Sequence, residues 1–89
     1  MNVSVGSSTA VQIVGANPKR ISLIIVNNHS SADLYIDTVS TLTTTTAGVI
    51  ISAGGNLTED SGGDRMWLGP WYGLAGENLI DVRYLERER

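Results

Sequence analysis

The chain has 89 residues, enough for one small domain that buries only about 60–65% of the surface exposed by its unfolded form. Its 6 Lys and Arg against 9 Asp and Glu give a net charge of −3, which opposes binding to the phosphate backbone of nucleic acid. Because the sequence has no cysteine and no apolar run of about 18 residues, it excludes a disulfide frame, a thiolate metal site and a membrane-spanning helix.

The first ten residues are polar and rich in Ser and Gly, and they predict a flexible N-terminal arm or a short edge strand over 1–10. They lack the basic and apolar regions of a secretory signal peptide, so we expect synthesis in the cytoplasm. Residues 11–14 form the first predicted strand of the domain. The segment 15–18 ends it, because Pro18 fixes its own φ and keeps Asn17 out of the helical region.

The segment from Ile21 to Asn27 carries the strongest strand signal. Its apolar residues fall on both faces of an extended chain, which is typical of a central strand in a sandwich. The polar run 27–31 predicts a turn whose side chains bond back to the local backbone, and 34–37 is the return strand. The threonine-rich segment 38–48 predicts a loop or an exposed edge strand.

The second half of the chain alternates short apolar runs with Gly-rich breaks. Residues 49–51 predict a strand, a turn follows at 52–56, and 57–59 predict a further strand. We expect 66–68 to be extended, and we interpret 71–76 as the connection to the last strand.

In that last strand, Ile80, Val82 and Tyr84 face one way and Asp81 and Arg83 the other. The alternating charges of 86–89 predict a solvated end, and we place the tail proper at 87–89. Six to eight short strands without a helical window therefore predict an all-β domain over 11–86, as an antiparallel β-sandwich or a small barrel.

Catalytic and metal chemistry finds little support in the sequence. His29 is the only histidine and lies in a turn of Asn and Ser, without a nucleophile elbow to complete a hydrolytic triad. Glu59, Asp60 and Asp64 surround a Gly-rich turn, but their spacing does not match a calcium-binding EF-hand loop. We therefore predict that the protein is not an enzyme and needs no metal or cofactor.

Aromatic residues near a Gly-Pro turn are the best candidates for an interaction surface. Rings on a β-sandwich can anchor a protein interface or stack on sugars, and they can also close the open end of the core. The candidate interface residues are Met66, Trp67, Pro70, Trp71 and Tyr72.

Several turn and strand signals recur together along the chain: Ala16-Asn17-Pro18-x-Arg20, Asn27-Asn28, Leu34-Tyr35-Ile36, Ala53-Gly54-Gly55 and Asp81-Val82-Arg83-x-Leu85-Glu86. Over residues 11–86 they resemble small virion structural proteins of tailed bacteriophages. The resemblance implies an all-β protein that assembles as a homo-oligomer or on the capsid lattice, as a head decoration, head fibre or minor structural component. It carries over no catalytic residue, and the segment 67–72 is bulkier here than the single aromatic usual in such proteins.

Taken together, the chain is expected to be a non-enzymatic viral structural protein, made in the host cytoplasm and located in the virion. We expect a homo-oligomer, with a trimer favoured, that binds the capsid or another virion protein and neither nucleic acid nor membrane. Its hydrophobic content of 42% and mean hydropathy of +0.04 agree with apolar surface that a partner covers. The alternative is a carbohydrate-binding or receptor-binding module that uses the same aromatic rings.

Overall fold

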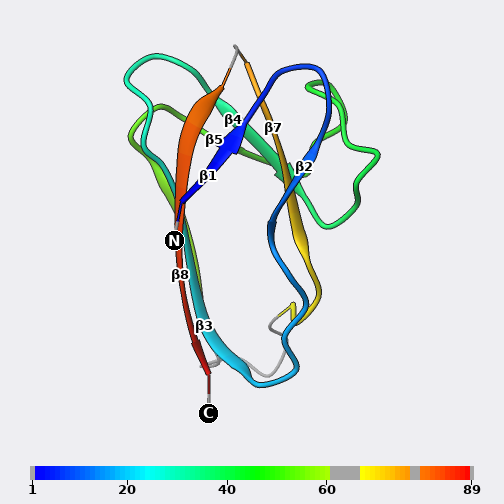
Figure 1. The fold of residues 1–89 in the computed structure, drawn as a ribbon, viewed down its shortest axis with the longest axis vertical. Helices are drawn as coiled ribbons and strands as arrows, with labels where there is room; N and C mark the ends of the chain where they lie inside the picture. Colours follow the sequence, from blue (N-terminus) through cyan, green and yellow to red (C-terminus); the bar gives the residue numbers. More distant parts are fainter. Residues whose placement is uncertain (1, 61–66, 77–78, 89) are drawn as a thin grey trace.

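The computed structural model describes residues 2–60, 67–76 and 79–88, and in that part of the chain the regular structure is β-strand throughout (Figure 1). This confirms the predicted all-β class. The strands are β1 (Asn2–Val5), β2 (Val11–Val14), β3 (Arg20–Asn27), β4 (Leu34–Asp37), β5 (Val49–Ile51), β6 (Asn56–Asp60), β7 (Trp71–Ala75) and β8 (Ile80–Glu88).

The strands form two four-stranded antiparallel sheets that face each other. Sheet A has the order β1-β8-β3-β6 and sheet B the order β2-β7-β4-β5. Four of the strand pairs are those of one long hairpin folded in the middle of the chain: β1 with β8, β2 with β7, β3 with β6 and β4 with β5. When this hairpin is rolled up, two more pairs form, β3 with β8 and β4 with β7. Such an arrangement is a jelly-roll sandwich. Of the sandwich and the barrel that the sequence allowed, the structure has the sandwich.

The core lies between the two sheets and is almost entirely aliphatic. Strand β3 sends Leu23 and Ile25 into it, while Ile24 and Val26 lie on the outer face of sheet A, so the prediction of a strand with two apolar faces is confirmed. The buried core residues are Val5, Ile13, Val14, Leu23, Ile25, Ala32, Leu34, Ile36, Ile51, Trp71, Ala75, Ile80 and Val82.

Strand β7 is the main departure from the prediction. The sequence signals favoured an extended 66–68 and a connection at 71–76, whereas Trp67 and Leu68 lie outside any strand and 71–75 is a central strand of sheet B. Met66 lies outside the described residues. Glycine weakens a strand signal, but Gly73 faces the core, where a Cβ would overlap the Ile13 side chain. Its missing side chain therefore leaves room for the Ile13 side chain of the neighbouring strand β2 in the same sheet.

The two ends of the chain are joined in sheet A. Strand β1 is an edge strand, and its Val5 is fully buried beside Ile80 of β8. The predicted orientation of β8 is confirmed, with Val82 buried and Arg83 exposed. However, β8 continues to Glu88 along β3, beyond the expected end of the last strand.

Polar residues fix the turns at the ends of the strands. Asn27 is fully buried: its side-chain amide donates to the carbonyls of Ala32 and Ile51, and its Oδ1 accepts the His29 N–H. The predicted back-bonding turn is thus confirmed. The segment 38–48 is a loop, and Asp37 accepts backbone N–H groups from both of its ends, Thr38 and Gly48.

Candidate interaction surface

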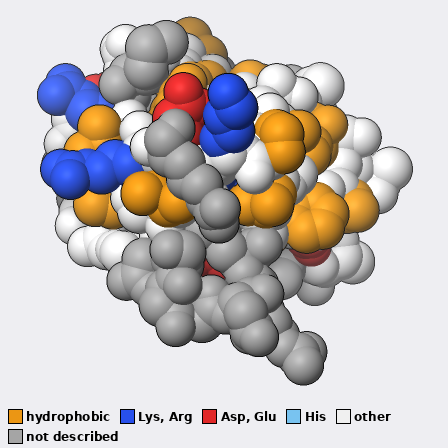
Figure 2. Space-filling view, turned by 90° about the horizontal axis from the view of Figure 1, so that it is seen from below, with side chains coloured by type: hydrophobic (Ala, Val, Ile, Leu, Met, Phe, Trp, Pro, Cys, Tyr) orange, Lys and Arg blue, Asp and Glu red, His pale blue; other side chains and the backbone are white. Residues whose placement is uncertain are grey.

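Residues 67–70, called here the Trp67–Pro70 loop, precede β7 at the lower end of the sandwich in Figure 1. The Trp67 side chain is 41% exposed and Leu68 is also exposed. From below, hydrophobic side chains lie on both sides of this end, interspersed with Lys and Arg side chains (Figure 2). Trp67 and Leu68 therefore give the loop an exposed apolar surface, of the kind found at the centre of protein contacts.

The indole ring of Trp67 is held in one orientation by its own loop. Its Nε1–H donates to the Pro70 carbonyl at 2.9 Å. The ring lies against Gly69, where an added Cβ would overlap the indole. One hydrogen bond and one glycine thus fix an exposed aromatic ring before any partner arrives, and this lowers the entropy lost on binding.

The backbone of the loop is anchored by a buried arginine. Arg20 donates from Nη1 to the carbonyls of Trp67 and Gly69 at 2.9 and 3.1 Å, and from Nη2 to the Gly15 carbonyl at 2.7 Å. The Asn17 N–H donates to the Leu68 carbonyl at 2.7 Å. Three consecutive loop residues therefore have their carbonyl groups bound, two by Arg20 at the start of β3 and one by Asn17 just before it, so the loop is rigid although its side chains are exposed.

Two carboxylates compensate the buried guanidinium. Arg20 Nε lies 2.6 Å from Glu86 Oε2 in a largely buried ion pair. Glu59, across Leu23 from Glu86 in the sheet, has its Oε1 buried without a hydrogen-bond partner. Burial raises the pKa of Glu59 above its ordinary value, and the positive charge of Arg20 opposes that shift only in part.

The five predicted interface residues do not share one surface. Trp67 and Pro70 belong to the exposed loop. Trp71 is only 7% exposed and is a core residue, with its Nε1 buried and unpartnered. Tyr72 follows it onto the outer face of sheet B, where it lies beside Asp37 of β4. Met66 lies outside the described residues.

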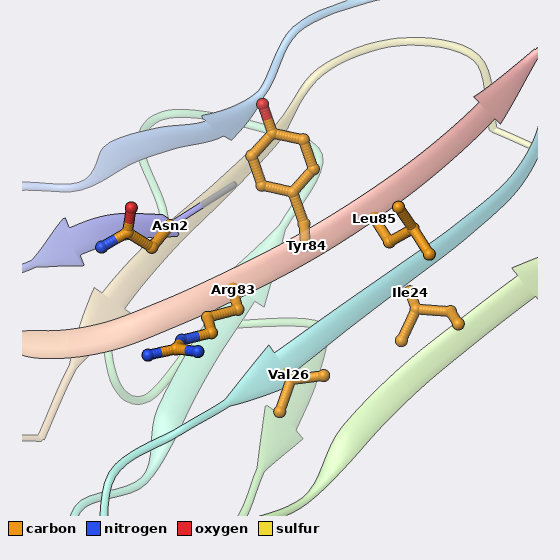
Figure 3. Close-up of a pocket in the computed structure, with 6 residues that line it drawn as sticks. All are labelled: Asn2, Ile24, Val26, Arg83, Tyr84 and Leu85. Carbon is orange, nitrogen blue, oxygen red and sulfur yellow. The ribbon is translucent and has the colours of Figure 1, made fainter.

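A second apolar surface lies on the outer face of sheet A (Figure 3). Ile24 and Val26 of β3 and Leu85 of β8 point out of the sheet on the same side, and Arg83 and Asn2 border them in a shallow hollow. Tyr84 points the other way, toward sheet B. Leu85 is 53% exposed, and with Ile24 and Val26 beside it the exposed apolar area is a patch rather than an isolated residue.

The groups considered for catalysis are used for local structure. The Nδ1 of His29 accepts the N–H groups of Ser31 and Ala32 and so stabilises its own turn. Glu59 is close enough to Arg20 for the positive charge to act on its pKa, while Asp64 lies outside the described residues. In the described ranges, no three His, Cys, Asp or Glu residues gather as metal ligands would.

Sequence reasoning missed Arg20 and the outer face of sheet A. A bulge in the pairing of β3 with β8 between Arg20 and Ser22 turns the arginine inward, and no sequence pattern marks such a bulge. The outer face left a visible signal, because Ile24 and Val26 were already assigned to the second face of an apolar strand. Pairing that face with Leu85 required the register of β8.

Comparisons with protein-family models, with curated proteins and with solved structures find no match to this chain. In the described part of the chain, no helix is long and apolar enough to cross a membrane.

Proposed function

We propose that the protein is a non-enzymatic structural component of a tailed-bacteriophage virion, which self-associates and also binds the capsid or another virion protein. The observation that carries the proposal is the number of large apolar side chains left exposed on so small a chain. Six large hydrophobic side chains are exposed in the described residues: Val39, Ile50, Trp67, Leu68, Leu79 and Leu85. Two groups among them form apolar patches, which mark interaction sites on soluble proteins: Trp67 with Leu68 on one loop, and Leu85 with the half-buried Ile24 and Val26 on the outer face of sheet A.

The Trp67–Pro70 loop supports docking to a second component. Anchor residues in protein interfaces are enriched in tryptophan, and a ring that is already fixed loses little freedom on binding. Here the Arg20 hydrogen bonds fix the loop backbone and the Pro70 carbonyl fixes the Trp67 ring. The loop lies at the end of the sandwich and leaves the two outer sheet faces available to other copies.

The fold gives a weaker argument, by analogy alone. Jelly-roll sandwiches recur in viral capsid proteins, and they also recur in lectins and in cupins. Because one fold serves many functions, the strand order agrees with a virion protein without selecting it. The resemblance of the turn and strand motifs to tailed-phage structural proteins favours the virion role.

The native mass of the purified chain tests self-association. Light scattering on a sizing column, run at several protein concentrations, is expected to give a trimer or a larger closed assembly. The mass should fall toward that of one chain on dilution if the contact is of standard size rather than obligate. A single-chain mass at every concentration would remove self-association from the proposal.

A second candidate function is carbohydrate binding, and the fixed, exposed ring of Trp67 favours it. A flat aromatic face held by its own loop is suited to stack on a sugar ring. A glycan array probed with the wild type and with Trp67→Ala decides between the two functions. A signal that Trp67→Ala abolishes, and that a Leu79→Ala control keeps, would favour the carbohydrate module over the virion role.

A further inference from the structure

His29 lies in the turn between β3 and β4, and its ring takes part in the hydrogen bonding of that turn. Its Nδ1 accepts the backbone N–H groups of Ser31 and Ala32, both at 3.1 Å. Its own backbone N–H donates to Oδ1 of Asn27 at 3.1 Å. The ring nitrogen thus has the acceptor role that Asn and Asp side chains commonly have in turns.

The turn that His29 closes connects the two sheets. The Asn27 side chain, at the end of β3 in sheet A, donates to the Ala32 carbonyl at 2.8 Å and to the Ile51 carbonyl of β5 in sheet B at 3.0 Å. Ala32 is a buried core residue whose N–H binds His29 and whose carbonyl binds Asn27. A change at the His29 ring therefore acts on the hydrogen bonds of a fully buried residue between the sheets.

Both hydrogen bonds at the ring require an unprotonated Nδ1. Their other partners are N–H donors, so the neutral ring carries its hydrogen on Nε2. A second proton binds at Nδ1 and turns this acceptor into a donor, which then faces two other donors. The charged ring therefore cannot keep its position in the turn. Histidine is the side chain whose charge ordinarily changes between about pH 5 and 8.

We propose that His29 is a pH-sensitive switch, which closes the turn of residues 27–32 while its ring is neutral and opens the turn when Nδ1 takes up a proton. The closed turn binds no proton at Nδ1, whereas the unfolded chain is free to do so. The folded protein should therefore lose stability as the pH decreases through the range in which imidazole is protonated. This inference does not depend on self-association, and its failure would leave the proposed function standing.

The charged groups around the turn in the described residues are Asp33, which follows it, and Asp81 and Arg83 of β8. Glu77 lies outside the described residues. Asp81 accepts the Asn28 amide at 3.0 Å and Arg83 Nε at 3.1 Å, and these contacts, the Asn28 amide first, hold the pKa of Asp81 below its ordinary value. Exposed carboxylates stabilise a nearby positive charge only weakly, whereas a proton at Nδ1 removes both N–H bonds of the turn at once.

The amide resonances of the turn test the switch in the wild-type protein. In NMR spectra recorded from about pH 8 to about pH 5, the Ser31 and Ala32 amide signals should shift with the midpoint of the His29 ring protons. The Ala47 amide, which donates to the Thr43 carbonyl in a segment without titratable residues, is the control and should not follow that midpoint. Ring protons that titrate while the two turn amides stay in place would overturn the assignment, as would a ring that shows no titration in this range.

His29→Asn separates the titration of the ring from its acceptor role. The Asn side chain accepts the same N–H groups through Oδ1, as in an Asx-turn, and has no proton to gain. Between about pH 8 and about pH 5, we expect the Tm of the wild type to fall by about 4–8 °C more than that of His29→Asn, the usual shift for the net loss of about one hydrogen bond in a domain of this size. The carboxylates that titrate at the acid end, Glu59 with its raised pKa among them, are present in both proteins and cancel in the comparison. Equal decreases in the two proteins would overturn the switch.

Discussion

Trp67 and Trp71 lie four residues apart and have opposite surroundings. Trp71 is 7% exposed at the start of a central strand and packs in the core, whereas Trp67 is 41% exposed on a loop. Their indole N–H groups differ as well: that of the exposed Trp67 donates a hydrogen bond, whereas that of the buried Trp71 has no partner. Sequence proximity therefore says little about shared role: one ring stabilises the fold, and the other is available for binding.

The comparison also shows how a loop can be rigid without being buried. The backbone of the loop that carries Trp67 is bound by the Arg20 guanidinium, which in turn binds Glu86. The loop is therefore held in place by a buried residue, because the arginine links the exposed loop to the interior. Four sets of variants test this division, in order of expected effect.

Trp71→Ala should have the largest effect on stability. Truncating a buried tryptophan costs about 3–5 kcal/mol, a large part of the roughly 5–15 kcal/mol available to a small domain. Trp71→Phe keeps most of the apolar volume and removes the unpartnered N–H, so its cost should stay below about 1.5 kcal/mol. Urea unfolding followed by circular dichroism measures both. Equal stability of Trp71→Ala and the wild type would contradict the core assignment.

Arg20→Met should come next, at about 3 kcal/mol, because it leaves the largely buried Glu86 carboxylate and three backbone carbonyls without their partner. Lys19→Met, at the exposed neighbouring position, is the control and should change stability by less than about 0.5 kcal/mol.

The same pair also tests the rigidity of the loop. In a Trp71→Phe background Trp67 is the only tryptophan, and its fluorescence anisotropy reports the motion of the loop. Faster depolarisation is expected with Arg20→Met and not with Lys19→Met. Unchanged anisotropy in both would show that Arg20 does not hold the loop.

Gly69→Ala separates the orientation of Trp67 from its presence. The new Cβ would overlap the indole ring, so the ring must move and release the Pro70 carbonyl, at a cost of about 1 kcal/mol. Gly6→Ala is the matched control, because nothing lies near the position of its Cβ. A shift of the Trp67 indole N–H resonance in the NMR spectrum should accompany Gly69→Ala alone. A resonance that stays in place would contradict the fixed-ring geometry.

Glu59→Gln should have the smallest effect, with a sign that depends on pH. The pKa of Glu59 is raised in the folded protein, so the folded state binds its proton more tightly than the unfolded state does. The contribution of Glu59 to stability is therefore present at low pH and is lost as pH rises from about the unfolded value of 4.5. Glu59→Gln should be slightly more stable than the wild type at pH 7 and should lose that advantage at pH 4. A lower stability of the variant at pH 7 would contradict this ordering.

Much of the fold could be predicted from the sequence, since alternation in β3 and β8 and the polar turn after Asn27 are local signals. Strand β7 could not be predicted, because Gly73 lowers the strand propensity of this segment. A glycine is needed there because the Ile13 side chain of another strand occupies the space of a Cβ. The order of the strands in the sheets also depends on pairings between distant segments, which no local pattern contains.

The candidate site was only partly predictable for the same reason. The aromatic cluster correctly indicated the Trp67–Pro70 loop as an exposed aromatic site. Knowing that a strand begins at residue 71 was also needed, because only the alternation of side chains along that strand places Trp71 inside and Tyr72 outside. Arg20 acts across 47 residues to reach the Trp67 carbonyl, and its inward turn depends on a bulge. Likewise, Leu85 becomes part of a surface only through its pairing with Ile24.

The native mass of the wild-type chain, followed over about a hundredfold range of concentration, tests the central claim most directly. Assembly through apolar surfaces predicts a trimer or larger ring at high concentration, with a mass that decreases on dilution. A mass of one chain across the whole range would contradict self-association and would leave the Trp67–Pro70 loop as a docking surface for a different partner.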